Sequence, residues 1–188
     1  MGEAVIECDN VAVRPLRDEP ADYALMARWL RDPRVLRWYE GRDRAFAYGD
    51  VVAKFAPRVL SAEGVRPCII EVDGAPAGYL QYYPVEDPSD YGLEDATGAW
   101  AFDLFLGEPR LWGSGAGTAA LCAMVTHVFQ VEGAAFAVID PRVANPRAVR
   151  SYEKAGFRRV RVLPGHEWHE GAHRDCWLMV LERPQAGT

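Results

Sequence analysis

The sequence predicts a mixed α/β fold built around one central sheet, and three observations carry that prediction. Segments of alternating apolar character interleave along the chain with segments of helical period. An Asp73-Gly74 pair between two strand-like runs is typical of a hairpin turn and indicates antiparallel pairing. The 188 residues are 49% hydrophobic and 26% charged, which is ordinary globular usage, so we expect residues 1–188 to form a single domain.

The first half of the chain is expected to hold one strand, two helices and a hairpin. Apolar spacing predicts a strand over residues 11–16 and a helix over 18–30 with Pro20 in its first turn. It also predicts a second helix over about 45–60 that bends near Pro57. Residues 67–83 form a strand, the Asp73-Gly74 turn and a second strand.

The second half alternates strands and helices before a final antiparallel pair. Residues 98–106 read as a strand with Trp100, Phe102, Leu104 and Leu106 on one face and Ala101, Asp103 and Phe105 on the other. A helix follows from Thr118, then a strand over 134–141 and a helix over 145–156, capped by Asn145 and ended by Gly156. Residues 157–163 and 175–183 close the sheet.

A glycine-rich stretch, RLWGSGAGT at residues 110–118, leads into the N-terminus of a predicted helix. Gly113, Gly115 and Gly117 alternate there at a cost in backbone entropy. The stretch is either a flexible loop or a cradle whose amides approach a phosphate. It lacks the lysine of a Walker loop and the glycine spacing of a dinucleotide-binding fold, and it matches the pattern Arg-x-x-Gly-x-Gly.

The stretch NPRAVRSYEKAGF, residues 145–157, follows that loop and makes the pattern specific. Together they resemble the GCN5-related N-acetyltransferases, a resemblance that is strongest over residues 100–157. It implies a twisted, mostly antiparallel sheet that splays at the cofactor site, with flanking helices, and acetyl-CoA as co-substrate without a metal. It also implies that cofactor contacts come from the splayed strand, the glycine stretch and the following helix: Leu104, Phe105, Leu106, Arg110, Leu111, Trp112, Gly113, Ser114, Gly115, Ala116, Gly117, Thr118, Asn145 and Tyr152.

Within that superfamily, LRWYEG, IIEVDGAPAGYLQYY and the lone Asp103 in its strand look like the aminoglycoside 6′-N-acetyltransferases. The resemblance implies transfer of acetyl to a primary amine of a polycationic sugar, and hence antibiotic resistance. An acidic segment, residues 85–98, is then either a solvated loop or a lip that attracts an amine. The implied acceptor contacts are aromatic rings and carboxylates: Trp38, Tyr39, Tyr79, Tyr82, Asp90, Asp103 and Asp140.

Two of these residues are predicted to carry the chemistry. A primary amine is mostly protonated at neutral pH and must lose a proton before it attacks a thioester. Asp103 is the one charge in an apolar run, so it is either a proton acceptor or a carboxylate bonded to backbone at a sheet irregularity. Tyr152 is either the proton donor to the leaving thiolate or a core aromatic residue.

Other acceptors and another class of function stay open on the sequence. A lysine-type siderophore precursor, a polyamine or a protein N-terminus are alternative amines, and a non-catalytic module that binds acyl-CoA or an antibiotic is the alternative of another class. The net charge of −6 argues against a nucleic-acid partner.

The remaining signals predict a cytoplasmic protein, monomeric or homodimeric. No run of 18 apolar residues could span a membrane, and the N-terminus lacks a secretory pattern. The four cysteines are scattered, and Cys122 and Cys176 are expected to be buried thiols. Three histidines at positions 166, 169 and 173 lack the His-Glu-x-x-His spacing and are expected in a mobile hairpin loop that binds no metal.

Overall fold

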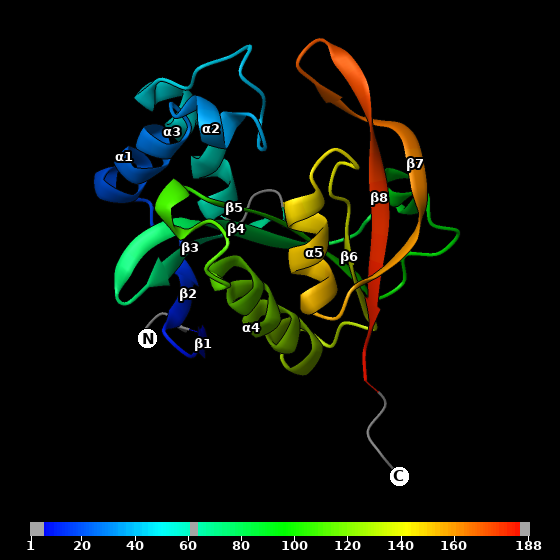
Figure 1. The fold of residues 1–188 in the computed structure, drawn as a ribbon. Coiled ribbons are helices and arrows are strands. Elements are labelled where there is room, and N and C mark those ends of the chain that lie inside the picture. The colour runs from blue at the N-terminus through cyan, green and yellow to red at the C-terminus, as the bar shows by residue number, and fades with distance from the viewer. Residues whose placement is uncertain (1–5, 61–63, 185–188) are drawn as a thin grey trace.

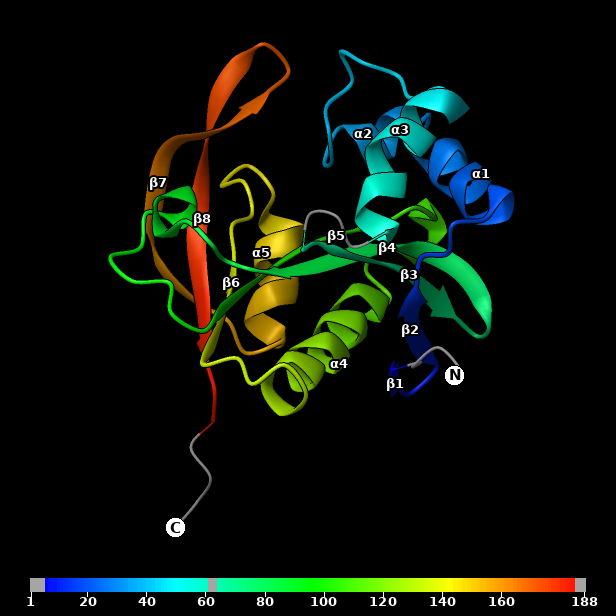
Figure 2. The ribbon, with the colours of Figure 1, turned by 180° about the vertical axis from the view of Figure 1, so that it is seen from behind.

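The computed structural model describes residues 6–60 and 64–184 and shows an eight-stranded sheet with helices on both faces (Figures 1 and 2). The strands are β1 (Ile6–Cys8), β2 (Val11–Pro15), β3 (Arg66–Val72), β4 (Ala75–Pro84), β5 (Ala99–Leu106), β6 (Phe136–Ile139), β7 (Arg158–His169) and β8 (Ala172–Glu182). The helices are α1 (Pro20–Trp29), α2 (Pro33–Leu36), α3 (Tyr48–Val59), α4 (Ala116–Gln130) and α5 (Pro146–Lys154), with 3-10 turns η1 (Pro88–Tyr91) and η2 (Pro109–Leu111).

The sheet is mostly antiparallel, in the order β1-β2-β3-β4-β5-β6-β8-β7, as predicted. Its one parallel pair joins β5 to β6 and covers only Ala99–Ala101 against Phe136–Val138. Beyond Ala101 the two strands separate, although β4 stays paired with β5 as far as Leu106. The predicted splay therefore lies at the strand that holds Asp103.

The alternation of residues along β5 sorts them between the two faces as expected. Trp100, Phe102, Leu104 and Leu106 pack with the apolar side of α4 and α5. Phe105 packs on the opposite face with Tyr79 and the helices α1–α3. Because Asp103 alternates with Phe102 and Leu104, it lies on the face that α1–α3 cover only in part.

Two helices match their predicted bounds closely, and two elements were missed. Helix α5 starts at Pro146, and the Asn145 side chain accepts a hydrogen bond from the Ala148 N–H at 3.2 Å. Helix α3 continues through Pro57. The short strand β1 and the one-turn helix α2 had too few residues to show a period. Trp38 and Tyr39 lie in the turn that follows α2.

The histidine-rich stretch is not the loop that was predicted. Strands β7 and β8 continue through it to a tight turn at Glu170-Gly171, where both residues have positive φ. A register shift between Leu163 and Glu167 accommodates Pro164-Gly165, so these residues kink the strand without ending it. His169 is buried, whereas His173 is exposed.

Candidate active site

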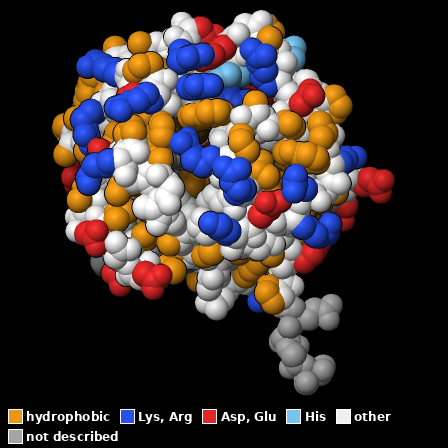
Figure 3. Space-filling view, in the orientation of Figure 1, with side chains coloured by type: hydrophobic (Ala, Val, Ile, Leu, Met, Phe, Trp, Pro, Cys, Tyr) orange, Lys and Arg blue, Asp and Glu red, His pale blue; other side chains and the backbone are white. Residues whose placement is uncertain are grey.

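The separation of β5 from β6 opens into a cavity of about 1150 Å³. Its walls come from Phe102–Leu106 of β5, the residues after β6, the glycine stretch, α5 and the β7–β8 hairpin. Figure 3 shows Lys and Arg side chains gathered around a hollow near the middle of this face. Within it we distinguish a glycine-loop end, formed by residues 111–118 and α5, and a hairpin end, formed by residues 38–40 and 167–168.

At the glycine-loop end, two of the three glycines are required by the backbone. Gly113 and Gly115 have φ of +85° and +99°, which side-chain-bearing residues rarely adopt, and Gly115 is the N-cap of α4. Gly117 lies inside α4, and an added Cβ would meet only Leu106 at 3.9 Å. Among the described residues, no close contact requires position 117 to lack a side chain. The first turn of α4 therefore faces the cavity with its amides and the positive end of its dipole.

Helix α5 brings basic side chains to the same end of the cavity. Arg147, Arg150 and Lys154 all line it. The Arg147 guanidinium lies 4.2 Å from the ring centroid of Trp112 and 5.8 Å from that of Trp38, so it spans from the glycine stretch toward the hairpin end. These three residues were not among the predicted site residues, although their spacing indicates that they share one face of the helix that follows the Asn145 cap.

Asp103 lies in the cavity wall with a fixed hydrogen-bond environment. Gln81 Nε2 donates to Asp103 Oδ2 at 2.6 Å, and the Tyr83 hydroxyl donates to the same oxygen at 3.2 Å. Gln81 is oriented in turn, because its Oε1 accepts from the Tyr79 hydroxyl at 2.7 Å and from Arg58 Nη1 at 2.9 Å. Among the described residues, both donors to this carboxylate contact Oδ2, and neither uses Oδ1.

The electrostatic surroundings of the cavity favour neutral forms of two acids. Burial raises the pKa of Asp103 to about 6, the nearby Asp140 carboxylate adds to the rise, and the bonds from Gln81 and Tyr83 oppose it. Burial also raises the pKa of the Tyr152 phenol well above its usual value, reinforced by the charges of Asp103 and Asp140. Tyr152 is 8% exposed and lines the cavity, so its phenol is protonated at neutral pH.

The hairpin end carries carboxylates and flat rings. Glu40, Asp140 and Glu167 line it together with Trp38, Tyr39 and Trp168. Asp140 Oδ2 is 3.0 Å from His166 Nε2, and this contact raises the pKa of His166. Glu40 is paired with Lys54, and Glu167 lies 3.4 Å from Arg142 Nη1. Glu167 was not among the predicted site residues, because the sequence around it is typical of a loop.

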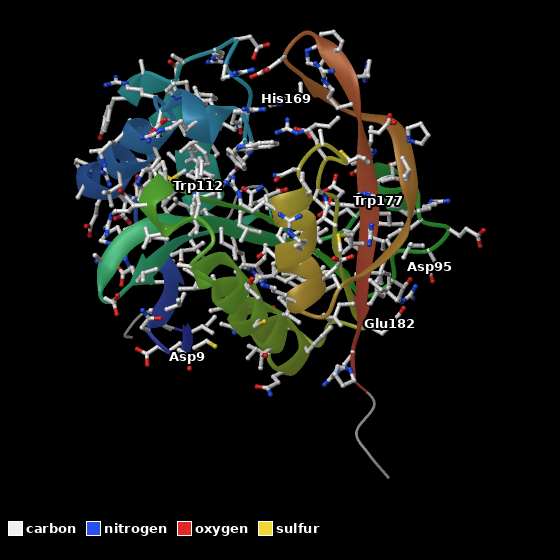
Figure 4. All side chains as sticks on the ribbon, in the orientation of Figure 1. Asp9, Asp95, Trp112, His169, Trp177 and Glu182 are labelled. Atoms are coloured by element: carbon white, nitrogen blue, oxygen red, sulfur yellow. The ribbon has the colours of Figure 1, made fainter. Side chains whose placement is uncertain are left out.

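The β7–β8 hairpin is fastened across this end to the segment that carries Trp38. The Arg37 carbonyl lies 3.1 Å from His169 Nε2 and 2.9 Å from Arg142 Nη2. Glu170 binds Arg42 through both carboxylate oxygens, at 2.6 and 2.7 Å. Figure 4 labels His169 near the hairpin and Trp112 at the glycine stretch.

Most of the predicted site residues meet in this one cavity. It is lined by Leu104, Phe105, Leu106, Leu111, Trp112, Gly113, Ser114, Gly115, Gly117, Thr118, Asn145 and Tyr152, and by Trp38, Tyr39, Asp103 and Asp140. Some of these side chains already have partners: Trp112 Nε1 donates to the Leu106 carbonyl at 2.9 Å, and Asn145 caps α5. Cys122, expected to be a buried thiol, lies on the cavity wall instead.

Five predicted site residues lie outside the cavity lining. Arg110 is exposed, 4.0 Å from Glu108, and Ala116 is buried under the start of α4. Tyr79 is fully buried beneath Gln81, and Tyr82 faces the α4 side of the sheet, against Trp100 and His127. Asp90 is exposed on η1, and the other four carboxylates of the acidic segment are exposed as well, so the segment does not form a lip on this cavity.

In residues 6–60 and 64–184, no three His, Cys, Asp or Glu side chains are grouped so that they could hold a metal ion. None of the described helices has the length and apolar character needed to cross a membrane.

The split sheet, the glycine-capped helix and the cavity between them define an acyl-CoA-dependent transferase of the N-acetyltransferase class. Residues 18–164 match the acetyltransferase (GNAT) domain family, and the chain belongs to it. It is a GNAT acetyl-CoA-dependent N-acetyltransferase.

Two curated relatives represent two groups of named activity. The chain is 33% identical over 153 residues to the aminoglycoside N(6′)-acetyltransferase type 1 of Klebsiella pneumoniae, covering 80% of this chain and 75% of that protein. It is 26% identical over 152 residues to the N5-hydroxyornithine acetylase sidL of Beauveria bassiana, covering 79% of this chain and 28% of that protein.

A solved structure agrees with the first group. The aminoglycoside acetyltransferase AAC(6′)-Ib in complex with coenzyme A and kanamycin superposes with a TM-score of 0.75 at 28% identity. The match covers 92% of this chain and 95% of that one.

Proposed function

We propose that this enzyme, as a single domain over residues 1–188, transfers acetyl from acetyl-CoA to the 6′-amine of an aminoglycoside. The observation that carries the proposal is the hairpin end of the cavity, where Asp140 and Glu167 stand beside Asp103 and the rings of Trp38 and Tyr39. A polycationic sugar needs dispersed carboxylates and flat faces for its ring C–H groups. The identity to aminoglycoside N(6′)-acetyltransferases supports the same acceptor.

The glycine-loop end fits the pyrophosphate and phosphate groups of coenzyme A. The first turn of α4 offers backbone N–H groups and its dipole, with Gly113 and Gly115 shaping the approach. Arg147, Arg150 and Lys154 add positive charge. The unpaired edge of β5 beyond Ala101 leaves backbone groups for the pantetheine arm, except that the Leu106 carbonyl is already bonded to Trp112. Acetyl-CoA supplies the acetyl group as a thioester.

Asp103 is the proposed proton acceptor. Its Oδ2 is held by Gln81 and Tyr83, which leaves Oδ1 for the ammonium group of the acceptor. Above pH 6 the carboxylate is mostly ionised, so it attracts the ammonium ion and then takes its proton. A base with a pKa near the working pH is the most effective, and the raised pKa of Asp103 meets that requirement.

Tyr152 is the proposed proton donor to the leaving thiolate. Its phenol keeps its proton at neutral pH because burial and two nearby carboxylates disfavour the phenolate. The thiol of coenzyme A has a pKa of about 8.5 by analogy with cysteine, so the Tyr152 phenol is the weaker acid. The proton transfer therefore needs the developing thiolate to lie close to the Tyr152 hydroxyl.

A second acceptor class is favoured by one specific observation. The guanidinium groups of Arg58 and Arg142 also line the hairpin end, and an amine that carries a carboxylate, of the lysine or ornithine type, would be attracted by them. The identity to a hydroxyornithine acetylase is consistent with this alternative.

A panel of amines tests the proposal. Coenzyme A release and product mass are measured with aminoglycosides that have a 6′-amine, with lysine and ornithine, with a polyamine and with a peptide N-terminus. Rapid, saturable release with the aminoglycosides supports the proposal. Turnover restricted to lysine or ornithine would support the second class, and absence of release with every amine would support a non-catalytic module. Cytoplasmic location, the absence of a bound metal and a monomeric or homodimeric state stay predictions.

A further inference from the structure

The acidic segment, residues 85–98, places one buried aromatic residue behind Asp103. Its carboxylates are exposed, but Tyr91 is 6% exposed and packs with Val85, Ala96 and Ala101. Asp87 caps η1 by accepting from the Ser89 N–H at 2.8 Å, and Gly92 ends it with φ of +58°. The segment is therefore a defined structure whose apolar side covers β5.

Tyr91 reaches Asp103 through Tyr83. The hydroxyl oxygens of Tyr83 and Tyr91 are 2.8 Å apart, and the Tyr83 hydroxyl lies 3.2 Å from Asp103 Oδ2. Because a carboxylate only accepts, the single Tyr83 proton points to Asp103, and the Tyr91 hydroxyl donates to Tyr83. Donors linked in this way polarise one another, which strengthens the bond at the carboxylate.

The strand register makes room for this chain of hydroxyls. Gln81 is directly opposite Asp103 and Tyr83 is opposite Ala101 in the β4–β5 ladder. Because the side chain of Ala101 is small, the Tyr83 side chain extends over it to the carboxylate at the diagonal position. A larger residue at position 101 would occupy the space that the two tyrosine rings share with Leu163 and Leu178.

We propose that Tyr83 and Tyr91 are positioning residues that fix the Asp103 carboxylate by its Oδ2, and that the acidic segment serves to deliver the Tyr91 hydroxyl. The inference rests on the proposed role of Asp103 as proton acceptor. The geometry alone supports the link: the hydroxyls of buried Tyr91 and half-buried Tyr83, from separate elements, lie in sequence and end on the Asp103 carboxylate.

Among the described residues, the charged and titratable groups around Asp103 contribute to how its carboxyl titrates. Besides Tyr83 and Tyr91, these groups come from the turn after α2, α3, β4, the segment after β6, α5 and β7, and they are Tyr39, Arg58, Tyr79, Asp140, Tyr152 and Glu167. Among the residues that the structure describes, Gln81 and Tyr83 are the ones that donate hydrogen bonds to the carboxylate. Removing the Tyr83 hydroxyl therefore disfavours the ionised form without changing a formal charge.

The test compares Tyr83→Phe, Tyr91→Phe and the double variant with Tyr23→Phe as a matched control. Tyr23 is also a buried tyrosine, and its hydroxyl donates to Asp18 at 2.7 Å, away from the cavity. We expect Tyr83→Phe to move the acid limb of kcat/KM up by about one pH unit, and Tyr91→Phe to move it less in the same direction. The double variant should match Tyr83→Phe alone, because Tyr91 acts only through Tyr83, and the control should not move the limb.

Carbon-13 NMR of the Asp103 carboxyl, assigned with Asp103→Asn, gives the same titration without any acceptor. This readout separates the inference from the proposed function, because it is independent of turnover. Shifts in the predicted order support the inference. An unmoved titration in Tyr83→Phe, or an equal effect of Tyr91→Phe with and without Tyr83, would overturn it. Coenzyme A affinity equal to that of the unmodified enzyme confirms that each variant is folded.

Discussion

Asp103 is the residue on which the proposed chemistry depends most. It sits on the less covered face of β5, at the point where β6 leaves the sheet, so it is partly buried and still reaches the cavity. Burial raises the pKa of Asp103 and so makes the carboxylate a stronger base. The hydrogen bonds from Gln81 and Tyr83 lower the pKa again, so the carboxyl still ionises near neutral pH. Position in the sheet thus sets both its access and its basicity.

At this scale, Asp103→Asn should lower kcat by about 10² to 10⁴, the usual contribution of a general base. The amide keeps the size of the side chain but accepts no proton from an ammonium ion. Calorimetry should show coenzyme A affinity within about twofold of the unmodified enzyme, because the glycine stretch is untouched. A kcat that stays unchanged would exclude Asp103 as the base.

The pH profile gives a second prediction at the residue scale. The pKa of this carboxyl is raised to about 6, so the base is protonated below that value and ionised above it. Turnover per acetyl-CoA complex should fall as the pH drops through about 6 and level off on the alkaline side. Initial-rate assays at saturating acetyl-CoA measure this limb, and a limb near pH 4 would contradict the raised pKa of Asp103.

Two elements divide the work of the cavity. The glycine stretch and α4 provide amides and a helix dipole at one end, and the β7–β8 hairpin, bound to the Arg37 carbonyl, encloses the other. The glycine stretch was predictable, because its spacing is local. The antiparallel pairing of the last two strands was predictable too, but its continuation through residues 164–174 was not, because a register shift that carries a strand across Pro164-Gly165 depends on its partner strand.

The glycine stretch predicts that Gly115→Glu weakens coenzyme A binding severely. The side chain would add a negative charge at the N-cap of α4, where phosphate is proposed to bind. Gly74→Glu is the matched control, because Gly74 also has a positive φ, of +74°, and open space for a Cβ, but lies in the β3–β4 turn. Calorimetry that finds the same loss for both would assign it to backbone strain.

The hairpin predicts a selective effect of His169→Ala. The change removes one partner of the Arg37 carbonyl and loosens the segment with Trp38, so KM for the amine should rise several-fold while KM for acetyl-CoA stays the same. His173→Ala on the same hairpin is the control, because its exposed ring contacts only Trp168 and the Gly165 carbonyl among the described residues. Equal changes in both KM values would contradict a role confined to the acceptor.

At the scale of the whole molecule, one topological feature organises the site. The sheet is antiparallel except between β5 and β6, where three residues of each strand pair in parallel, and it opens where that pairing stops. The opening gathers residues from both halves of the chain, with Trp38 and Tyr39 from the first half and Asp140 and Glu167 from the second. The basic side chains of α5 lie at the glycine-loop end, whereas the hairpin end holds carboxylates together with Arg58 and Arg142.

This feature also explains which site residues the sequence could predict. Asp103, Tyr152 and the glycine stretch lie in local motifs, and the structure places them in one cavity. Tyr79 and Tyr82 were predicted by residue type, but they are three residues apart on β4 and so face opposite sides of the sheet, and neither lines the cavity. Arg58 and Glu167 come from distant elements, and only the folded chain brings them to the cavity.

The regiochemistry of the product tests the central claim most directly. The enzyme is incubated with acetyl-CoA and an aminoglycoside that has a 6′-amine, and in parallel with its analogue that has a 6′-hydroxyl group. The account predicts a single added acetyl, located at the 6′-nitrogen by mass spectrometry and NMR, and no product from the analogue. Acetylation of lysine or ornithine with no modification of the 6′-amine would contradict the acceptor assignment.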